Sequence, residues 1–127
     1  MSESDRHEKG LARFREVFGR DPRPGNNPDF IKITVDHLFG EIWTRPHLEL
    51  RERSLITLSA LAMAKADWEL RGHVGAALNL GISRETILET MMHVAYYGGW
   101  PVGLHGLQIA QAVFEEQDAK SKKATEP

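Results

Sequence analysis

Apolar residues recur at helical spacing along the chain, and glycine and proline divide this pattern into helix-sized segments. Leu11, Phe14, Val17 and Phe18 are spaced as on one face of a helix. Two prolines within residues 21–25 end the segment, because proline disfavours helical geometry in the residue before it. The pattern therefore predicts a first helix that ends near Phe18.

The second predicted segment has clear signals at both ends. Asn27 is followed by Pro28 and Asp29, an order typical of a helix N-terminus, and Pro46 prevents a helix from continuing beyond Arg45. Further helices are predicted over residues 50–65, 67–80, 83–98 and 101–117.

Polar residues and glycines mark the boundaries of the later helices. Asp67 and Ser83 are predicted to cap two of them, and Gly81 and Gly99 follow their ends. No segment shows convincing strand alternation. We expect an all-α fold of about six helices, in a single domain over residues 1–127 with flexible ends at residues 1–8 and 118–127.

Two segments carry more apolar surface than a small helical domain covers. Within residues 55–64 only Thr57 and Ser59 are polar, so nearly every face of that helix is apolar. Such a helix is central in a core or buried between subunits. Residues 91–114 add a second apolar run, so the sequence predicts a homo-oligomer.

Composition and charge exclude several classes of protein. The chain of 127 residues has 16 basic and 18 acidic residues and therefore lacks the basic surplus of a nucleic-acid binder. It contains no cysteine, which excludes disulfides, thiolate nucleophiles and cysteine-ligated metals. No signal peptide or membrane-length apolar run is found, so we expect a cytoplasmic protein with no membrane partner.

Glu69 and His73 form the first candidate for chemistry. They lie four residues apart, and therefore on one face of the predicted helix. A carboxylate beside an imidazole can tune it for proton transfer. The same spacing also occurs in solvated surface pairs, and the sequence leaves both interpretations open.

The other histidines and the motif search indicate neither a metal nor a cofactor. The chain has six histidines in separate elements and no His-Glu-x-x-His motif. His93 lies among apolar residues, where a hydrogen-bonded core histidine is common. No phosphate-binding loop, dinucleotide fingerprint or activated serine motif is present, so no cofactor and no metal are predicted.

Two segments contain residues suited to a pocket that binds an acid. Glu41 and Arg45 lie four apart beside Trp43, and Arg53 follows. Arginine is the natural clamp for a carboxylate, although salt bridging at a helix end is the alternative. The aromatic run at residues 96–100 is either a pocket wall or a packed turn.

Four segments together resemble one family. They are Trp43-Thr44-Arg45-Pro46, Leu50-Arg51-Glu52-Arg53-Ser54-Leu55, His73 with Ala77-Leu78-Asn79-Leu80-Gly81, and His93 with Tyr97, Gly99 and Pro101. The combination resembles the γ-carboxymuconolactone decarboxylase family over residues 38–101, and more loosely over residues 27–114. His47 and Trp100 depart from the expected pattern, and bulky side chains at these two positions would reshape the pocket.

The wider superfamily contains alkyl hydroperoxidase D-like proteins, whose relay is Cys-x-x-Cys-x-x-x-His with an upstream glutamate. When the histidine is aligned with His73, the cysteine positions fall on Ala66 and Glu69, and the glutamate position falls near Ser54. The resemblance therefore implies the helical fold of this superfamily without its peroxidase activity, because that activity requires thiolates.

The family resemblance implies a specific reaction. This is the cofactor-free decarboxylation of 4-carboxymuconolactone to 3-oxoadipate enol-lactone in protocatechuate catabolism. A small carboxylate or lactone substrate and a trimer or hexamer are implied with it.

The resemblance also suggests roles for residues at the matching positions. His73 would be the proton donor or enolate stabiliser, Glu69 would set its charge or orientation, and His93 would be a second acid. Arg45 and Arg53 would bind the carboxylates of the substrate, and Glu41 would orient Arg45. The pocket wall would be formed by Trp43, Tyr97 and Trp100.

Two alternatives stay open at this point. One is a related decarboxylase, isomerase or cyclase that acts on another lactone or keto acid. The other is a non-catalytic helical oligomer that binds a ligand or partner.

Overall fold

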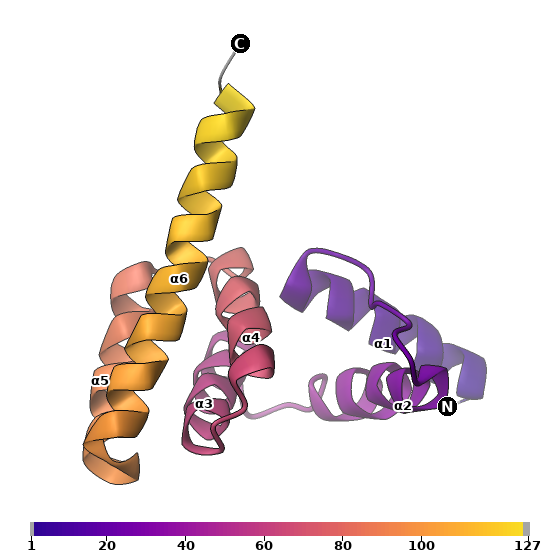
Figure 1. Ribbon diagram of the computed structural model, residues 1–127. Coiled ribbons are helices and arrows are strands. Elements are labelled where there is room, and N and C mark those ends of the chain that lie inside the picture. Colours follow the sequence, from indigo (N-terminus) through magenta and orange to yellow (C-terminus); the bar gives the residue numbers. More distant parts are fainter. Residues whose placement is uncertain (1, 126–127) are drawn as a thin grey trace. The chain divides into compact units, whose positions relative to one another are not determined.

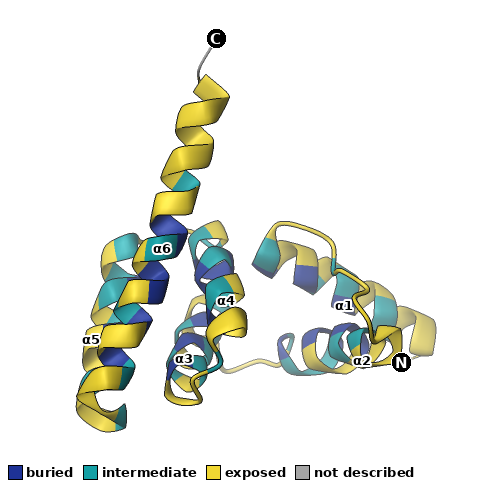
Figure 2. Cartoon of the chain, in the orientation of Figure 1, coloured by how far each residue is buried: buried dark blue, intermediate teal, exposed yellow. Residues whose placement is uncertain are grey.

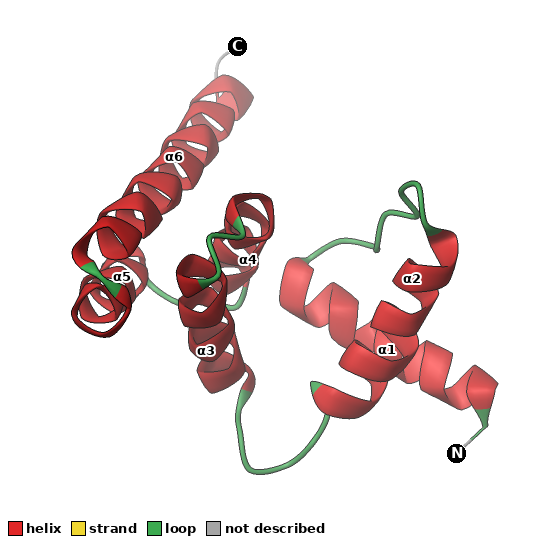
Figure 3. Cartoon of the chain, turned by 60° about the horizontal axis from the view of Figure 1, so that its bottom comes forward, coloured by secondary structure: helices red, strands yellow, loops and turns green. Residues whose placement is uncertain are grey.

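Every regular element of the chain is helical within residues 2–125, the range that the computed structural model describes (Figure 3). In chain order the elements are α1 (Glu3–Phe18), α2 (Pro28–Ile33), η1 (Thr34–Ile42), α3 (Leu50–Met63), α4 (Asp67–Asn79), α5 (Arg84–Gly98) and α6 (Trp100–Thr125) (Figure 1). The predicted all-α class is confirmed. Contacts between residues group the chain into two compact units, which meet in sequence between Arg53 and Ser54.

The N-terminal unit is held by aromatic packing between α1 and η1. Phe14 and Phe18 of α1 stack at 4.5 Å between ring centroids, and Phe39 of η1 meets Phe14 edge-on at 5.1 Å. Trp43 stacks on Phe39 at 5.4 Å and is only 6% exposed. Paired aromatic rings add a geometric preference to the gain from apolar burial.

A buried carboxylate also joins α1 to η1. The Asp36 carboxylate accepts hydrogen bonds from the His7 imidazole, at 2.6 Å, and from the Lys32 ammonium, at 2.5 Å. Burial raises the pKa of Asp36, but the hydrogen bonds from Lys32 and His7 outweigh that effect and lower the pKa below its ordinary value. Asp36 therefore stays charged inside the unit, because two donors satisfy it.

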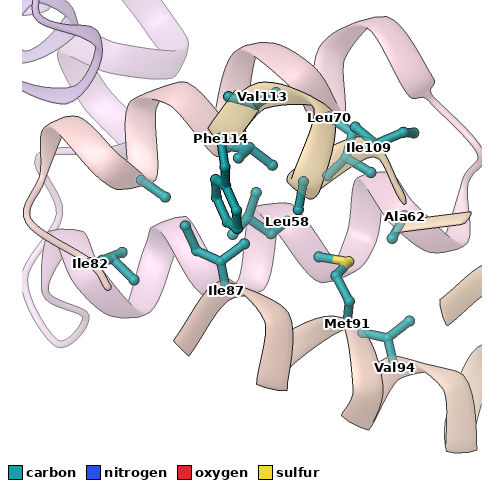
Figure 4. Packing of buried hydrophobic residues seen from close by; sticks show 13 residues of the cluster. Leu58, Ala62, Leu70, Ile82, Ile87, Met91, Val94, Ile109, Val113 and Phe114 are labelled. Atoms are coloured by element: carbon teal, nitrogen blue, oxygen red, sulfur yellow. The ribbon is translucent and has the colours of Figure 1, made fainter. Parts of the chain in front are cut away.

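The C-terminal unit has its own apolar core. In Figure 4 the Phe114 ring of α6 and Ile87 of α5 point toward Leu58 of α3, and Met91 lies beside Val94 along α5. The side chains of Leu58, Ile87 and Met91 are fully buried. α5 and α6 run side by side (Figure 1).

Two predicted helix starts are confirmed and a third is not. The side-chain oxygens of Asn27 and Ser83 accept backbone N–H groups at 3.1 Å, as N-caps do. Asp67 is instead the first residue of α4, and Ala66 precedes it without a side-chain cap bond.

Both chain ends contain helix where the sequence predicts flexible segments. α1 already begins at Glu3, because Ser2 caps it by accepting from the backbone N–H of Asp5 at 3.1 Å. α6 continues to Thr125, and Arg84 binds Asp118 within the predicted flexible end at 2.7 Å. The described part of α6 beyond its core contacts is exposed (Figure 2). Residue 1 and residues 126–127 lie outside the described range.

α3 is not buried on every face within this chain. Leu58 and Ala62 face the core, whereas Ile56 and Met63 are 55% and 49% exposed. Part of the apolar surface that the sequence predicts for this helix therefore stays exposed in the folded chain. Among the described residues, no helix is both long and apolar enough to span a membrane.

Candidate functional site

The predicted site residues fall into two groups, one in each compact unit. The N-terminal unit contains Glu41, Trp43, Arg45 and Arg53. The C-terminal unit contains Glu69, His73, His93, Tyr97 and Trp100.

The pair Glu69 and His73 lies on the side of α4 next to its core face. Leu70, Val74 and Ala77 of the same helix are buried, and the helical period then leaves His73 half-buried and Glu69 exposed. Burial lowers the pKa of His73 below its ordinary value of 6.5, while the charge of Glu69 raises it in part. His73 is therefore a neutral imidazole at neutral pH, in contact with protein interior on one side and near a carboxylate.

His93 lines an open cleft on the C-terminal unit. The cleft has a volume of about 560 Å³, and it is lined by Ser59, Thr86, Glu89, Thr90, Met92, His93 and Tyr96. The imidazole lies 5.2 Å from the Tyr97 ring, measured between centroids. His93 is exposed rather than a core histidine, so it can reach a bound molecule or solvent.

Tyr97 and Trp100 lie on an exposed aromatic surface where α5 passes into α6. Tyr97 is 78% exposed and Trp100 is 66% exposed. Trp100 meets Tyr96 edge-on at 5.8 Å and lines an apolar groove of about 220 Å³ with Met92 and Leu104. In the folded chain these aromatic side chains form a surface patch rather than an enclosed pocket.

The two arginines are brought together in the N-terminal unit. The Arg53 guanidinium donates from Nη2 to the backbone carbonyl of Arg45 at 3.0 Å. The Arg45 side chain itself is exposed. This contact fixes Arg53 at the segment between η1 and α3, so both cations border the same loop.

Glu41 does not orient Arg45 within the described residues. Its carboxylate pairs with Arg6 at 2.7 Å and with His37 at 3.4 Å. The four-residue spacing fails because η1 ends at Ile42 and the chain turns before Arg45. Trp43, expected at a pocket wall, belongs to the core of its unit through its contact with Phe39.

The fold creates a pair of an acidic and a basic residue that no sequence motif indicates. His105 Nε2 lies 2.9 Å from Asp67 Oδ2, although 38 residues separate them. No local pattern joins α4 to α6 in this way, because the sequence around Asp67 indicates only a helix cap. Within residues 2–125, no group of three or more histidine, aspartate or glutamate side chains could hold a metal ion.

Comparisons with known proteins agree with the motif pattern. A sequence model of the carboxymuconolactone decarboxylase family matches residues 28–112. The 4-carboxymuconolactone decarboxylase of Acinetobacter baylyi is 29% identical over 123 residues, which cover 91% of this chain and 92% of that protein. The nitrosuccinic acid decarboxylase of Metarhizium robertsii is 30% identical over 100 residues, which cover 79% of this chain and 66% of that protein. The segment that matches the family model, residues 28–112, contains every predicted site residue.

Proposed function

Because the chain belongs to the carboxymuconolactone decarboxylase family, we propose that it is a decarboxylase of small dicarboxylic acids that needs no cofactor. The substrate proposed first is 4-carboxymuconolactone, converted to 3-oxoadipate enol-lactone in protocatechuate catabolism. Two relatives named as decarboxylases support the reaction class.

The chemistry of these acids explains how a small helical protein can catalyse their decarboxylation without a cofactor. In 4-carboxymuconolactone, the bond between a ring carbon and its carboxylate breaks, and CO₂ leaves. The electron pair moves through the conjugated ring to the lactone carbonyl, and a proton then adds to a ring carbon. Nitrosuccinic acid is also a dicarboxylic acid, and its nitro group can accept an electron pair in the same manner. The protein must bind carboxylates, stabilise the enolate and deliver one proton.

His73 is the residue that we propose to deliver the proton. The observation that carries this proposal is a half-buried imidazole beside Glu69, within the segment that matches the family. Burial keeps the imidazole neutral in the free protein, and a bound dianionic substrate favours its protonated form. The proton acquired in this way is then placed near the carbon that needs it, with Glu69 favouring the same charged state. In this scheme His93 is a second acid.

Arg45 and Arg53 are proposed to bind the substrate carboxylates. Guanidinium groups form paired hydrogen bonds with carboxylates, and the Arg53 side chain is already positioned by its bond to the Arg45 carbonyl. The exposed Arg45 side chain is available to a ligand. Tyr97 and Trp100 are proposed to pack their exposed rings against the bound acid.

The experiment is an assay of CO₂ release from 4-carboxymuconolactone by the wild type and the His73→Gln variant. We expect kcat/KM to fall by at least about 100-fold in His73→Gln, the usual contribution of a general acid. His37→Gln is the matched control, because His37 is an exposed histidine of the N-terminal unit.

The outcomes separate the mechanism from the substrate and from the enzyme class. Near-normal turnover by folded His73→Gln would remove His73 from the mechanism. Release of CO₂ only from another dicarboxylic acid or lactone acid would correct the substrate. If no acid of such a panel loses CO₂, the protein is not a decarboxylase of this class.

A further inference from the structure

A second cavity of the C-terminal unit shares no lining residue with the cleft at His93. Its volume is about 550 Å³, within the range of small-molecule sites. It is formed where the end of α3, the start of α4, the end of α5 and the start of α6 meet, and its lining residues are Ala62, Lys65, Asp67, Gly98, Pro101, Val102 and His105.

The polar part of this cavity has one positive charge available to a ligand. The Asp67 carboxylate is bound by the His105 imidazole at 2.9 Å between Oδ2 and Nε2. Within residues 2–125, no carboxylate lies within ion-pair distance of the Lys65 ammonium. Asp67 therefore holds the imidazole in place, and Lys65 supplies the charge that an incoming anion would meet.

The backbone at Lys65 is held in an unusual conformation. Lys65 has a φ of 57°, in the left-handed region that side chains other than glycine rarely adopt. The turn is fixed by the bond from Lys65 N–H to the Ala62 carbonyl, at 3.1 Å, and by the bond from Ala66 N–H to the Leu61 carbonyl, at 3.0 Å. These two bonds are those of the Schellman motif, which ends many helices with one left-handed residue, so the C-cap of α3 fixes the backbone of Lys65 at the edge of the cavity.

The other walls of the cavity are apolar and closely packed. Pro101 and Val102 form one side, and Ala62 is buried on another. A Cβ added at Gly98 would meet the Met63 side chain at 3.0 Å, so glycine allows α5 to approach α3 here. The cavity therefore combines an apolar wall with a cationic end.

We propose that this cavity binds a small organic carboxylate. The carboxylate is held by the Lys65 ammonium and by the Nδ1–H of the His105 imidazolium, whose Nε2–H donates to Asp67. The apolar body of the ligand packs against Pro101 and Val102. Asp67 is a positioning residue that orients His105. The site goes beyond the proposed decarboxylation, because none of its polar residues takes part in that reaction scheme.

The test is an NMR titration of the full chain with two probes of the same shape, cyclopentanecarboxylate and cyclopentanecarboxamide. We expect the carboxylate to shift the signals of the lining residues and to bind at least about tenfold more tightly than the neutral amide. Lys65→Gln keeps most of the side-chain length and removes the charge, so it should raise the Kd of the carboxylate at least about tenfold. Lys120→Gln, which removes an exposed lysine of α6, should leave the Kd unchanged.

A second variant distinguishes the contribution of the imidazole to binding from its contribution to folding. His105→Gln keeps an amide donor for Asp67 and removes the imidazole, so it should weaken carboxylate binding while circular dichroism and thermal unfolding stay those of the wild type. The proposal is overturned if neither probe shifts the lining residues, if both probes bind equally, or if Lys65→Gln and Lys120→Gln behave alike.

The identity of the natural carboxylate is decided by kinetics on the same variants. If Lys65→Gln raises KM for the decarboxylase substrate in step with the lost probe binding, that substrate occupies the cavity. If KM is unchanged while probe binding is lost, the cavity serves a separate carboxylate. The binding readout stands by itself if no decarboxylase activity is found.

Discussion

At the scale of single residues, His73 shows how burial and charge oppose each other at one side chain. Its surroundings disfavour the charged imidazolium, and burial accordingly lowers its pKa, while Glu69 acts in the opposite direction. The proposed catalytic form is the protonated one. A bound substrate with two negative charges would stabilise the imidazolium form of His73, which burial disfavours in the free protein.

This balance predicts a particular pH dependence. If protonated His73 donates the proton, kcat/KM should fall as pH rises through the lowered pKa of the free protein. The corresponding fall in kcat should occur at higher pH, because bound carboxylates raise the pKa of His73 in the complex. The measurement is a pair of pH profiles of kcat/KM, one for the wild type and one for His73→Gln. The variant should lack the fall in kcat/KM that the titration of His73 causes in the wild type. A kcat/KM that rises with pH through the same region would contradict the proposed role.

At the scale of elements, the contact between α1 and η1 depends on glycine. A Cβ at Gly10 would overlap the carbonyl oxygen of Val35, and one at Gly40 would lie 2.7 Å from the carbonyl oxygen of Arg6. The backbones therefore approach each other directly, and the aromatic rings of Phe14 and Phe39 close the contact beside them. Any side chain at these two positions would force the helices apart.

Gly10→Ala should consequently destabilise the N-terminal unit. Overlap with a backbone oxygen cannot be relieved by rotating a side chain, so we expect a loss of about 1–3 kcal/mol or more in the free energy of unfolding. Gly72→Ala on α4 is the matched control, because a Cβ there would meet nothing within 4 Å. That change should be neutral or stabilise by roughly 0.5–1 kcal/mol. Urea unfolding of both variants checks this, and equal stability of the two would refute it.

The same elements show what local sequence signals can determine. The sequence correctly predicts Asn27 and Ser83 as caps, because each forms its hydrogen bond within three residues. The same signals do not predict the π-helix η1. Its hydrogen bonds, such as the one from Trp43 N–H to the Leu38 carbonyl at 2.8 Å, span five residues. A start signal does not distinguish that spacing from the α-helical one, which differs by a single residue.

At the scale of the whole molecule, apolar side chains stay exposed after the chain has folded. Met92, Tyr96, Trp100 and Leu104 lie together at the apolar groove of α5 and α6. All four are at least 49% exposed. Contiguous apolar surface of this kind is typical of a protein interface. It is consistent with the homo-oligomer predicted from the sequence.

The predicted trimer or hexamer can be tested at this surface. Leu104→Glu introduces a charge at the groove, so size-exclusion chromatography with light scattering should show a shift to a smaller assembly. Leu48→Glu is the control, because Leu48 is an exposed leucine of a loop outside the groove. A wild type that is monomeric, or a Leu104→Glu variant of unchanged mass, would contradict the predicted interface.

The sequence by itself determined the helical class, most helix starts and the family, because these depend on periodicity, caps and motifs within short stretches of chain. It also selected His73 with Glu69, a pair within one helix. Only the tertiary structure decided that Glu41 pairs with Arg6, that Trp43 is a core residue and that His105 meets Asp67 beside Lys65. These contacts join residues distant in sequence, and the packing of whole helices, rather than any local pattern, brings them within reach.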